Sequence, residues 1–356
     1  MTTSPMSTER TAGRIVCVLL AATLVASACG DGGGADDDAA APTSTTAPSR
    51  TAPPAVTDTD VSADCASVPT GVSELVLDAG GAEHDVQVYV PTTYDGRSEL
   101  PLVVNFHGFA SNGRQQAAVT GYEGLAEEEG FIVAHPTAVP ASTDESRRSS
   151  WELADIDDPA KDDVAFTNAL LDLLIDEYCV DETHVYATGM SGGGLFTSRL
   201  VCDMSDRIAA ASSVAGLAHS ESCDPARPVP FMAIHGTEDD RVPFDGDLTG
   251  TWFADEEFAQ ALFSEPMPDQ FAQFAETMGC DPEGERVQQS TDVVATTYTG
   301  CDDDVPLVFY EVVDGGHTWP SSPLADMLTD FQGYITFDID ATADSWAFFE
   351  QHPLEP

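Results

Sequence analysis

The sequence predicts an α/β fold in which a mostly parallel central sheet is covered by helices on both faces. Nearly continuous apolar runs at residues 102–106, 131–135 and 229–234 are typical of strands that are buried on both sides. Residues 163–178 instead place apolar side chains at helical spacing. Because such strands and helices alternate along the chain, they imply parallel strands joined by helices.

Residues 1–28 have the pattern of a lipoprotein-type signal peptide. Arg10 and Arg14 precede an uncharged run that is too short to span a membrane and ends in small residues. The run closes at residues 24–29 with LVASAC, which resembles a bacterial lipobox. We therefore expect Cys29 to be lipidated and the chain to be anchored at the extracellular face of the membrane. A plain signal peptide, with release of the chain, is the alternative.

Residues 29–64 form a compositionally biased segment of mostly Gly, Asp, Ala, Pro, Ser and Thr. Such a segment cannot bury enough apolar surface to fold, so it is predicted to be a disordered tether. The globular domain then spans residues 65–356, which is near the upper size for a single core.

The chain is strongly acidic. It has 62 Asp plus Glu against 13 Lys plus Arg, a formal net charge of −49, and Lys161 is its only lysine. This balance argues against binding nucleic acid or anionic lipid through the domain surface, which leaves the N-terminal lipid as the expected membrane contact. The acidic runs lack the alternation of a calcium-binding loop, and we expect no metal, no other cofactor and a monomer.

Six cysteines remain in the predicted domain, an even number that suggests disulfides in an oxidising compartment. No Cys-x-x-Cys pair is present, which argues against zinc. Loop closure favours partners that are close in sequence. The expected pairs are Cys202–Cys223, Cys280–Cys301 and, by elimination, Cys65–Cys179.

The first elements of the domain are predicted from alternation and apolar runs. Residues 73–77 and 84–90 alternate apolar and polar side chains around two glycines, which indicates an antiparallel hairpin at a sheet edge. The apolar run 102–106 predicts a central strand and residues 115–129 a helix. The strand at 131–135 is closed by a proline.

The middle of the chain follows the same alternation. Residues 163–178 predict an amphipathic helix, and the β-branched and aromatic run 183–188 predicts the next strand. A helix at 195–201 follows. The small apolar run 208–214 and the buried run 229–234 predict two further strands.

An irregular segment precedes the last predicted elements of the chain. Residues 247–263 are interpreted as an irregular insertion, and residues 269–278 as a helix with its aromatic side chains on one face. The apolar run 307–313 predicts the last strand, and residues 345–351 the last helix.

A candidate nucleophile stands between the predicted strand 183–188 and helix 195–201. Residues 189–193 read GMSGG, which matches the Gly-x-Ser-x-Gly pattern of a nucleophile elbow. The required order of strand, tight turn and helix is present, so Ser191 is the predicted nucleophile. A Gly/Ser-rich loop without a role is the alternative reading of so short a motif.

A base and an acid follow in the order that this motif requires. His317 comes directly after the last strong strand, at the end of the sheet where α/β folds place their sites. Asp239 follows the strand 229–234 and is the predicted acid that orients the imidazole, with Asp240 and Asp245 as alternatives.

Two backbone amides are predicted to form an oxyanion hole. One is the N–H of Gly192, which follows the nucleophile, and the other is the N–H of Phe109, in the loop after the strand 102–106. The substrate-pocket candidates are Met190, Trp151 and Trp319, with core packing as the alternative for the tryptophans.

These residues carry a resemblance to a known family. The pieces that match are VVNFHG at 103–108, Trp151, DDVAF at 162–166, VYATGMSGG at 185–193, HGTED at 235–239 and GGHTWP at 315–320. They resemble the α/β-hydrolase group that contains poly(3-hydroxybutyrate) depolymerases, feruloyl esterases and acetylxylan esterases of the family-one carbohydrate esterase type. The resemblance implies an α/β-hydrolase fold, the Ser191–His317–Asp239 triad, and the disulfides Cys202–Cys223 and Cys280–Cys301.

The resemblance also implies a function. We expect a secreted or surface-tethered serine esterase that hydrolyses carboxylic esters through an acyl-enzyme, with feruloyl or acetyl polysaccharide esters, or hydroxyalkanoate polyesters and oligomers, as substrates. Gly192 and Phe109 differ from the residues that many members carry there, and Phe109 reshapes the acyl side. The alternative is a surface lipoprotein that binds a ligand through an inactive hydrolase fold.

Overall fold

The computed structural model describes residue 65 and residues 68–140, 149–153, 161–249, 251 and 257–355. The chain divides into two units, Met1–Thr57 and Asp58–Pro356, and all described residues belong to the second unit. The predicted signal peptide, the lipidation site Cys29 and the tether lie outside the described residues. Among the described helices, none is both long enough and apolar enough to cross a membrane.

A ten-stranded sheet organises the second unit, with the strand order β1-β2-β4-β3-β5-β6-β7-β10-β9-β8. The six strands from β4 to β10 in this order are parallel, and antiparallel strands complete both edges. The strands are β1 (Gly71–Ala79), β2 (Ala82–Val90), β3 (Leu100–Phe106), β4 (Ile132–Pro136), β5 (Val180–Met190), β6 (Ala210–Val214), β7 (Phe231–Gly236), β8 (Glu285–Gln288), β9 (Val293–Tyr298) and β10 (Leu307–Val312).

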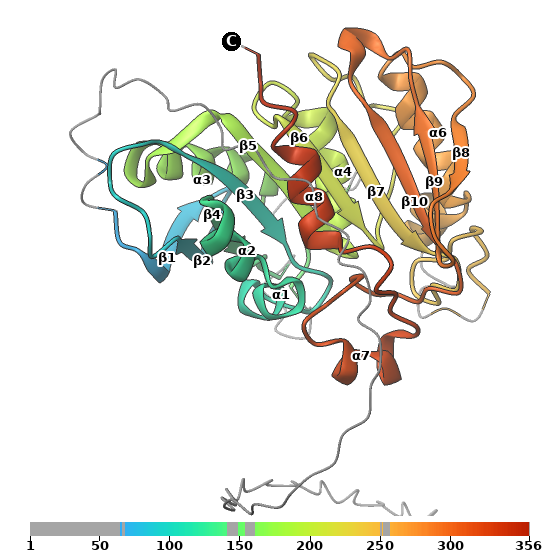
Figure 1. The fold of residues 1–356 in the computed structure, drawn as a ribbon, viewed down its shortest axis with the longest axis horizontal. Coiled ribbons are helices and arrows are strands. Elements are labelled where there is room, and N and C mark those ends of the chain that lie inside the picture. Colours follow the sequence, from blue (N-terminus) through green and yellow to red (C-terminus); the bar gives the residue numbers. More distant parts are fainter. Residues whose placement is uncertain are drawn as a thin grey trace, which may run out of the picture. The chain divides into compact units, whose positions relative to one another are not determined.

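Helices cover both faces of the sheet, as predicted, and α8 crosses in front of the central strands in Figure 1. One core packs α3, α4 and α6 against one face, and a second core packs α2 and α8 against the other. The helices are α1 (Gly113–Thr120), α2 (Tyr122–Glu129), α3 (Asp163–Tyr178), α4 (Gly192–Asp203), α5 (Glu257–Phe263), α6 (Met267–Thr277), α7 (Ala325–Gln332), α8 (Ala341–Phe349) and the short 3-10 helix η2 (Asp302–Asp304).

The α/β-hydrolase fold is confirmed, two local predictions are corrected, and some elements were not predicted. The single helix expected at 115–129 is two helices, because Gly121 adopts φ 70° and ends α1. The antiparallel strands β8 and β9 were not predicted, and neither was α7. The segment 247–263, expected to be irregular, ends in the helix α5.

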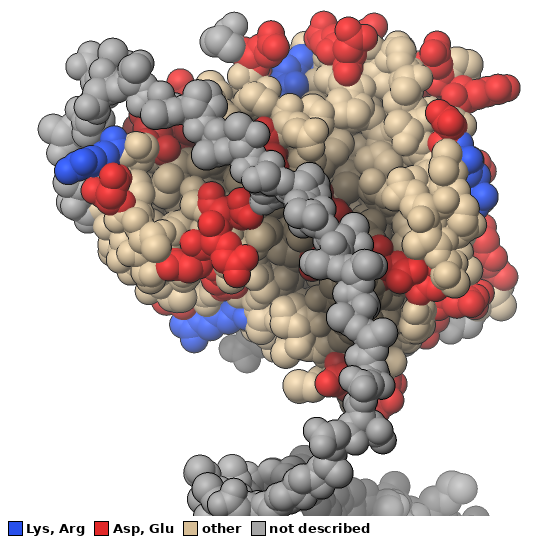
Figure 2. Space-filling view, viewed as in Figure 1, with Lys and Arg blue, Asp and Glu red and all other residues tan. Residues whose placement is uncertain are grey.

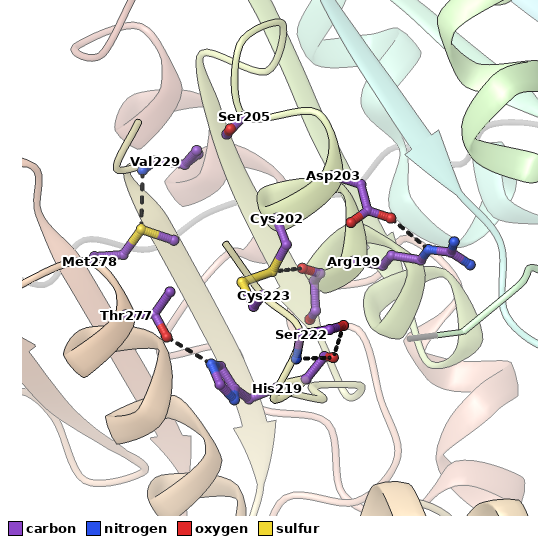
Figure 3. The surroundings of a disulfide bond; sticks show 12 residues. Arg199, Cys202, Asp203, Ser205, His219, Ser222, Cys223, Val229, Thr277 and Met278 are labelled. Carbon is purple, nitrogen blue, oxygen red and sulfur yellow. Dashed lines mark hydrogen bonds and ion pairs between the residues drawn. A yellow bond between two sulfur atoms is a disulfide. The ribbon is translucent and has the colours of Figure 1, made fainter. Parts of the chain in front are cut away.

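Three disulfides connect the cysteines in the expected pairs, Cys65–Cys179, Cys202–Cys223 and Cys280–Cys301. Cys202 lies in the last turn of α4, and Cys223 lies in the loop between β6 and β7 (Figure 3). The same loop is held to α6 by a hydrogen bond of 2.8 Å between His219 Nε2 and Thr277 Oγ1. These contacts attach the helix that follows Ser191 to its surroundings.

Candidate active site

Ser191 occupies the sharp turn between β5 and α4. Its backbone has φ 57° and ψ −122°, a conformation that non-glycine residues rarely adopt. The amide of Ser191 donates to the Val214 carbonyl at 2.9 Å, which ties the turn to β6. A Cβ on Gly193 would lie 2.0 Å from the Phe106 carbonyl oxygen, so only glycine fits there. The strain and the close packing are those of a nucleophile elbow.

His317 and Asp239 meet at the carboxyl ends of two neighbouring parallel strands, β10 and β7. His317 Nδ1 lies 2.8 Å from Asp239 Oδ2, and both side chains are almost fully buried. The loops approach closely because Gly236 has no Cβ; one would lie 2.3 Å from the Gly315 carbonyl oxygen. With Nδ1–H donating to the carboxylate, Nε2 of the imidazole is left to accept a proton.

Asp239 is held as a carboxylate by its surroundings. Burial raises the pKa of this side chain, but His317 and His235 outweigh that effect, so the pKa lies far below its usual range. Asp239 Oδ1 accepts the amides of Arg241 at 2.9 Å and Val242 at 3.0 Å, which fixes the carboxylate plane. The group therefore stays charged and oriented toward the imidazole.

Within the described residues, the two other acids that the sequence left open form no hydrogen bond or ion pair with His317. Asp240 and Asp245 are both exposed. Asp245 Oδ1 accepts the Asp247 amide at 3.0 Å, which closes a local turn. Of the three candidates, the structure brings only Asp239 to the imidazole.

The predicted oxyanion donors lie side by side above the elbow. A Cβ on Gly192 would lie 3.2 Å from the Phe109 amide nitrogen, and one on Gly108 would lie 3.6 Å from Ser191 Oγ. Within the described part of the chain, no hydrogen bond takes up the Phe109 N–H. Two amides next to a nucleophile are the arrangement that stabilises a developing oxyanion.

His107 braces this loop. Its Nε2 accepts the Ala138 amide at 2.9 Å, and its Nδ1 lies 2.7 Å from the Gly108 carbonyl oxygen to which it donates. Burial lowers the pKa of His107 to about 4, so the imidazole is neutral near pH 7. A neutral ring is required, because Nε2 accepts a hydrogen bond here.

The three residues predicted as substrate-pocket candidates are buried, which favours the core-packing alternative. Trp151 is 3% exposed and stacks on Phe196, with its indole N–H donating to the His107 carbonyl at 2.9 Å. Trp319 is fully buried and donates to Thr342 Oγ1 at 3.0 Å. Met190 is 5% exposed and belongs to the second core. These side chains build the core beneath the site, because their surface is already used in packing.

Sequence reasoning missed the groups that hold the site in place. His235 Nε2 lies 3.4 Å from Asp239 Oδ2, and the buried Lys161 donates to the backbone carbonyls of Val139 and Ser150. The signal for Lys161 was present, since a single lysine stands beside two aspartates in a chain with 62 acidic residues. A buried ion pair is one reason to keep a lysine at such a position.

A family model described as "Putative esterase" matches residues 79–272, which is more than half of the chain. The chain belongs to this esterase family. The match includes the elbow at Ser191 and the loop of Asp239.

Individual relatives agree with the family. The esterase is 31% identical over 245 residues to "Putative esterase NocK" of Nocardia uniformis subsp. tsuyamanensis, which covers 65% of this chain and 67% of the relative. It is 27% identical over 242 residues to feruloyl esterase B of Piromyces equi, covering 65% of this chain and 42% of the relative. The chain spans between about a fifth and two thirds of the length of the first curated relatives that it matches.

A solved structure supports the fold. The crystal structure of a thermostable esterase aligns with a TM-score of 0.51 at 14% sequence identity, over 79% of this esterase and 63% of that chain. At this identity the likeness concerns the α/β-hydrolase fold alone.

Proposed function

We propose that this esterase family member is a serine hydrolase that cleaves carboxylic esters through an acyl-enzyme. The observation that carries the proposal is the pairing of buried His317 with Asp239 at 2.8 Å, in a sheet whose strand β5 ends in a strained elbow at Ser191. A surface loop would not need a buried histidine and carboxylate at the carboxyl ends of two strands.

The residues suggest the following steps. Ser191 Oγ attacks the ester carbonyl carbon while His317 Nε2 accepts the hydroxyl proton. The carbonyl oxygen becomes an oxyanion, which the amides of Phe109 and Gly192 stabilise. The tetrahedral intermediate collapses, and the imidazolium gives its proton to the departing alcohol. Water, deprotonated by His317, then attacks the acyl-enzyme and releases the acid and free Ser191.

The proposed substrate class is supported by the relatives and by the exposed side chain of Phe109. Feruloyl esterase B and a bifunctional acetylxylan esterase/xylanase are among the relatives, so feruloyl and acetyl esters of polysaccharides are the first candidates, with hydroxyalkanoate esters next. Phe109 is 49% exposed beside the proposed oxyanion hole, where its ring offers an apolar surface to an acyl group.

The proposed location is outside the cytosol. Three disulfides support it, because such bonds form and persist in oxidising compartments. We include in this proposal the lipid anchor at Cys29 and a monomeric domain.

A panel of esters tests the proposed function. Purified protein and its Ser191→Ala variant are assayed on p-nitrophenyl esters, methyl ferulate, acetylated xylan and poly-hydroxybutyrate film. The proposal expects the wild type to hydrolyse at least the soluble esters and the variant to lose this activity by several orders of magnitude. Equal background rates for both proteins would favour an inactive hydrolase fold that binds a ligand.

A further inference from the structure

A buried lysine connects two separate stretches of backbone near the proposed oxyanion hole. The Lys161 side chain is 2% exposed. Its ammonium group donates to Asp163 Oδ2 at 2.7 Å, to the Val139 carbonyl at 3.3 Å and to the Ser150 carbonyl. A lysine has three N–H donors, so these three acceptors satisfy it completely. Because a buried ammonium group is costly unless it is fully paired, this side chain occupies a site built to hold it.

Both carbonyls belong to segments that touch the loop at residues 107–111, which we call the oxyanion loop. On one side, Val139 follows Ala138, whose amide donates to His107 Nε2 at 2.9 Å. Lys161 therefore holds the peptide directly beside a contact to the oxyanion loop.

On the other side, Ser150 stands between two residues that contact the same loop. The Ser149 carbonyl accepts the Ala110 amide at 2.8 Å, and Trp151 Nε1 donates to the His107 carbonyl at 2.9 Å. These two bonds hold the loop on either side of Phe109 in the sequence, at His107 and at Ala110. Lys161 holds the backbone between them.

The carboxylate partner of the lysine strengthens the same connection. Asp163 Oδ2 also accepts the Glu152 amide at 2.7 Å, and the Asp163 amide donates to Glu152 Oε2 at 2.9 Å. Burial raises the pKa of Asp163, and Lys161 offsets part of that effect. The start of α3 is thus bonded to the segment that carries Trp151.

We propose that Lys161 is a positioning residue that fixes the oxyanion loop, and with it the Phe109 amide, by clamping the backbone of Val139 and Ser150. The inference rests on the proposed function, because it assigns a catalytic consequence to this geometry. Lys161 itself does not touch the substrate; it acts through two peptide groups and the residues next to them.

The double variant Lys161→Met/Asp163→Asn tests the proposal. It removes both charges together, which avoids a buried unpaired charge, and the introduced side-chain amide oxygen can still accept the Glu152 amide. The expected result for p-nitrophenyl acetate is a fall in kcat of about 10- to 100-fold with KM changed by less than about twofold, because a displaced oxyanion donor affects the transition state more than substrate binding. The inhibition constant of a trifluoromethyl ketone, which forms an oxyanion on the serine, should rise by the same factor.

Arg227→Met is the matched control. Arg227 is another partly buried cation that donates to backbone carbonyls, those of Ile208, Ala209 and Pro228, but it lies at the amino end of β6, away from the site. Its loss should lower the melting temperature and leave kcat and the ketone inhibition constant within about twofold of the wild type.

Trp151→Phe gives a second test if the double variant does not fold. It keeps an aromatic ring in the core and removes only the N–H that bonds the His107 carbonyl. We expect a lower kcat and weaker ketone binding with an unchanged KM. A wild-type kcat in a folded double variant, or in Trp151→Phe, overturns the clamp, whereas absence of turnover in the wild-type protein overturns the proposed function instead.

Discussion

At the scale of single residues, the molecule keeps titratable groups buried in defined protonation states. Asp239 is charged beside His317, because the two histidines around it outweigh the effect of burial on its pKa. His107 and His135 are neutral, because burial lowers the pKa of the first to about 4 and of the second to about 3. The buried histidines therefore link stability to pH.

The stability of the wild type relative to a His135→Leu variant should fall as the pH is lowered. The unfolded chain binds a proton at His135 near pH 6.5, but the folded protein resists it until about pH 3. The stabilising effect of the neutral imidazole is complete above pH 6.5 and is lost progressively below it. Urea unfolding should show a relative loss of roughly 2–3 kcal/mol between pH 7 and pH 4.5. A stability difference that does not change with pH would contradict the buried neutral state.

At the scale of elements, the residues of the proposed site lie at the carboxyl ends of parallel strands, and the loops after these strands orient their side chains. β5, β7 and β10 present Ser191, Asp239 and His317 in the order predicted from the sequence. The helix α7 follows the histidine loop, and the segment just past the helix bonds to that loop, since the Gly316 amide donates to the Tyr334 carbonyl at 3.0 Å. This region carries several exposed apolar side chains, namely Met327, Phe331, Tyr334 and Phe337.

The double variant Phe331→Ser/Phe337→Ser should affect bulky esters more than small ones. Both side chains are mostly exposed, at 77% and 69%, so the changes leave the core intact. We expect KM for p-nitrophenyl esters with long acyl chains to rise about three- to tenfold, because apolar contact area is lost, and p-nitrophenyl acetate to be unaffected. Val72→Ser/Val76→Ser is the control, since these exposed residues lie on the edge strand β1. The same effect from both pairs would argue against a role for α7 and the segment that follows it.

The sequence predicted the parallel strands well because most of them are short runs of apolar or β-branched residues. It predicted Ser191 and His317 from local motifs, and the structure brings His317 to Asp239. The strand β8 was missed because Glu285–Gln288 is exposed along its whole length and shows no apolar alternation. The strand β9 does carry a strand signal, since Val293–Tyr298 is rich in β-branched residues. The break at Gly121 was missed because one glycine within a helical pattern does not by itself end a helix.

The exposure of the tryptophans and the role of Lys161 could not be predicted in the same way. Whether Trp151 lines a pocket or packs in the core depends on Phe106 and Phe196, which come from other parts of the chain. Two of the three acceptors of Lys161 are backbone carbonyls, which cannot be identified from the residue types in the sequence.

At the scale of the whole molecule, the surface is dominated by negative charge. Acidic side chains are spread over the face shown in Figure 2, with few basic ones among them. With a formal net charge of −49, mutual repulsion opposes the compact state.

The melting temperature should therefore rise with salt. Sodium chloride at molar concentration shortens the range of charge repulsion to about 3 Å, so we expect an increase of several degrees between 50 mM and 1 M at pH 7. The same titration at pH 4, where many carboxylates are protonated, should show a smaller increase. A flat or falling curve at pH 7 would mean that repulsion does not limit stability.

The most direct test of the central claim, that Ser191 is an activated nucleophile, is intact-protein and peptide mass spectrometry after reaction with a fluorophosphonate. The proposed function predicts one adduct per chain, located on Ser191, and none in Ser191→Ala. It also predicts labelling that is slower by orders of magnitude in His317→Ala, because the base is gone. A folded wild-type protein that forms no adduct, or an adduct that persists in Ser191→Ala, would contradict it.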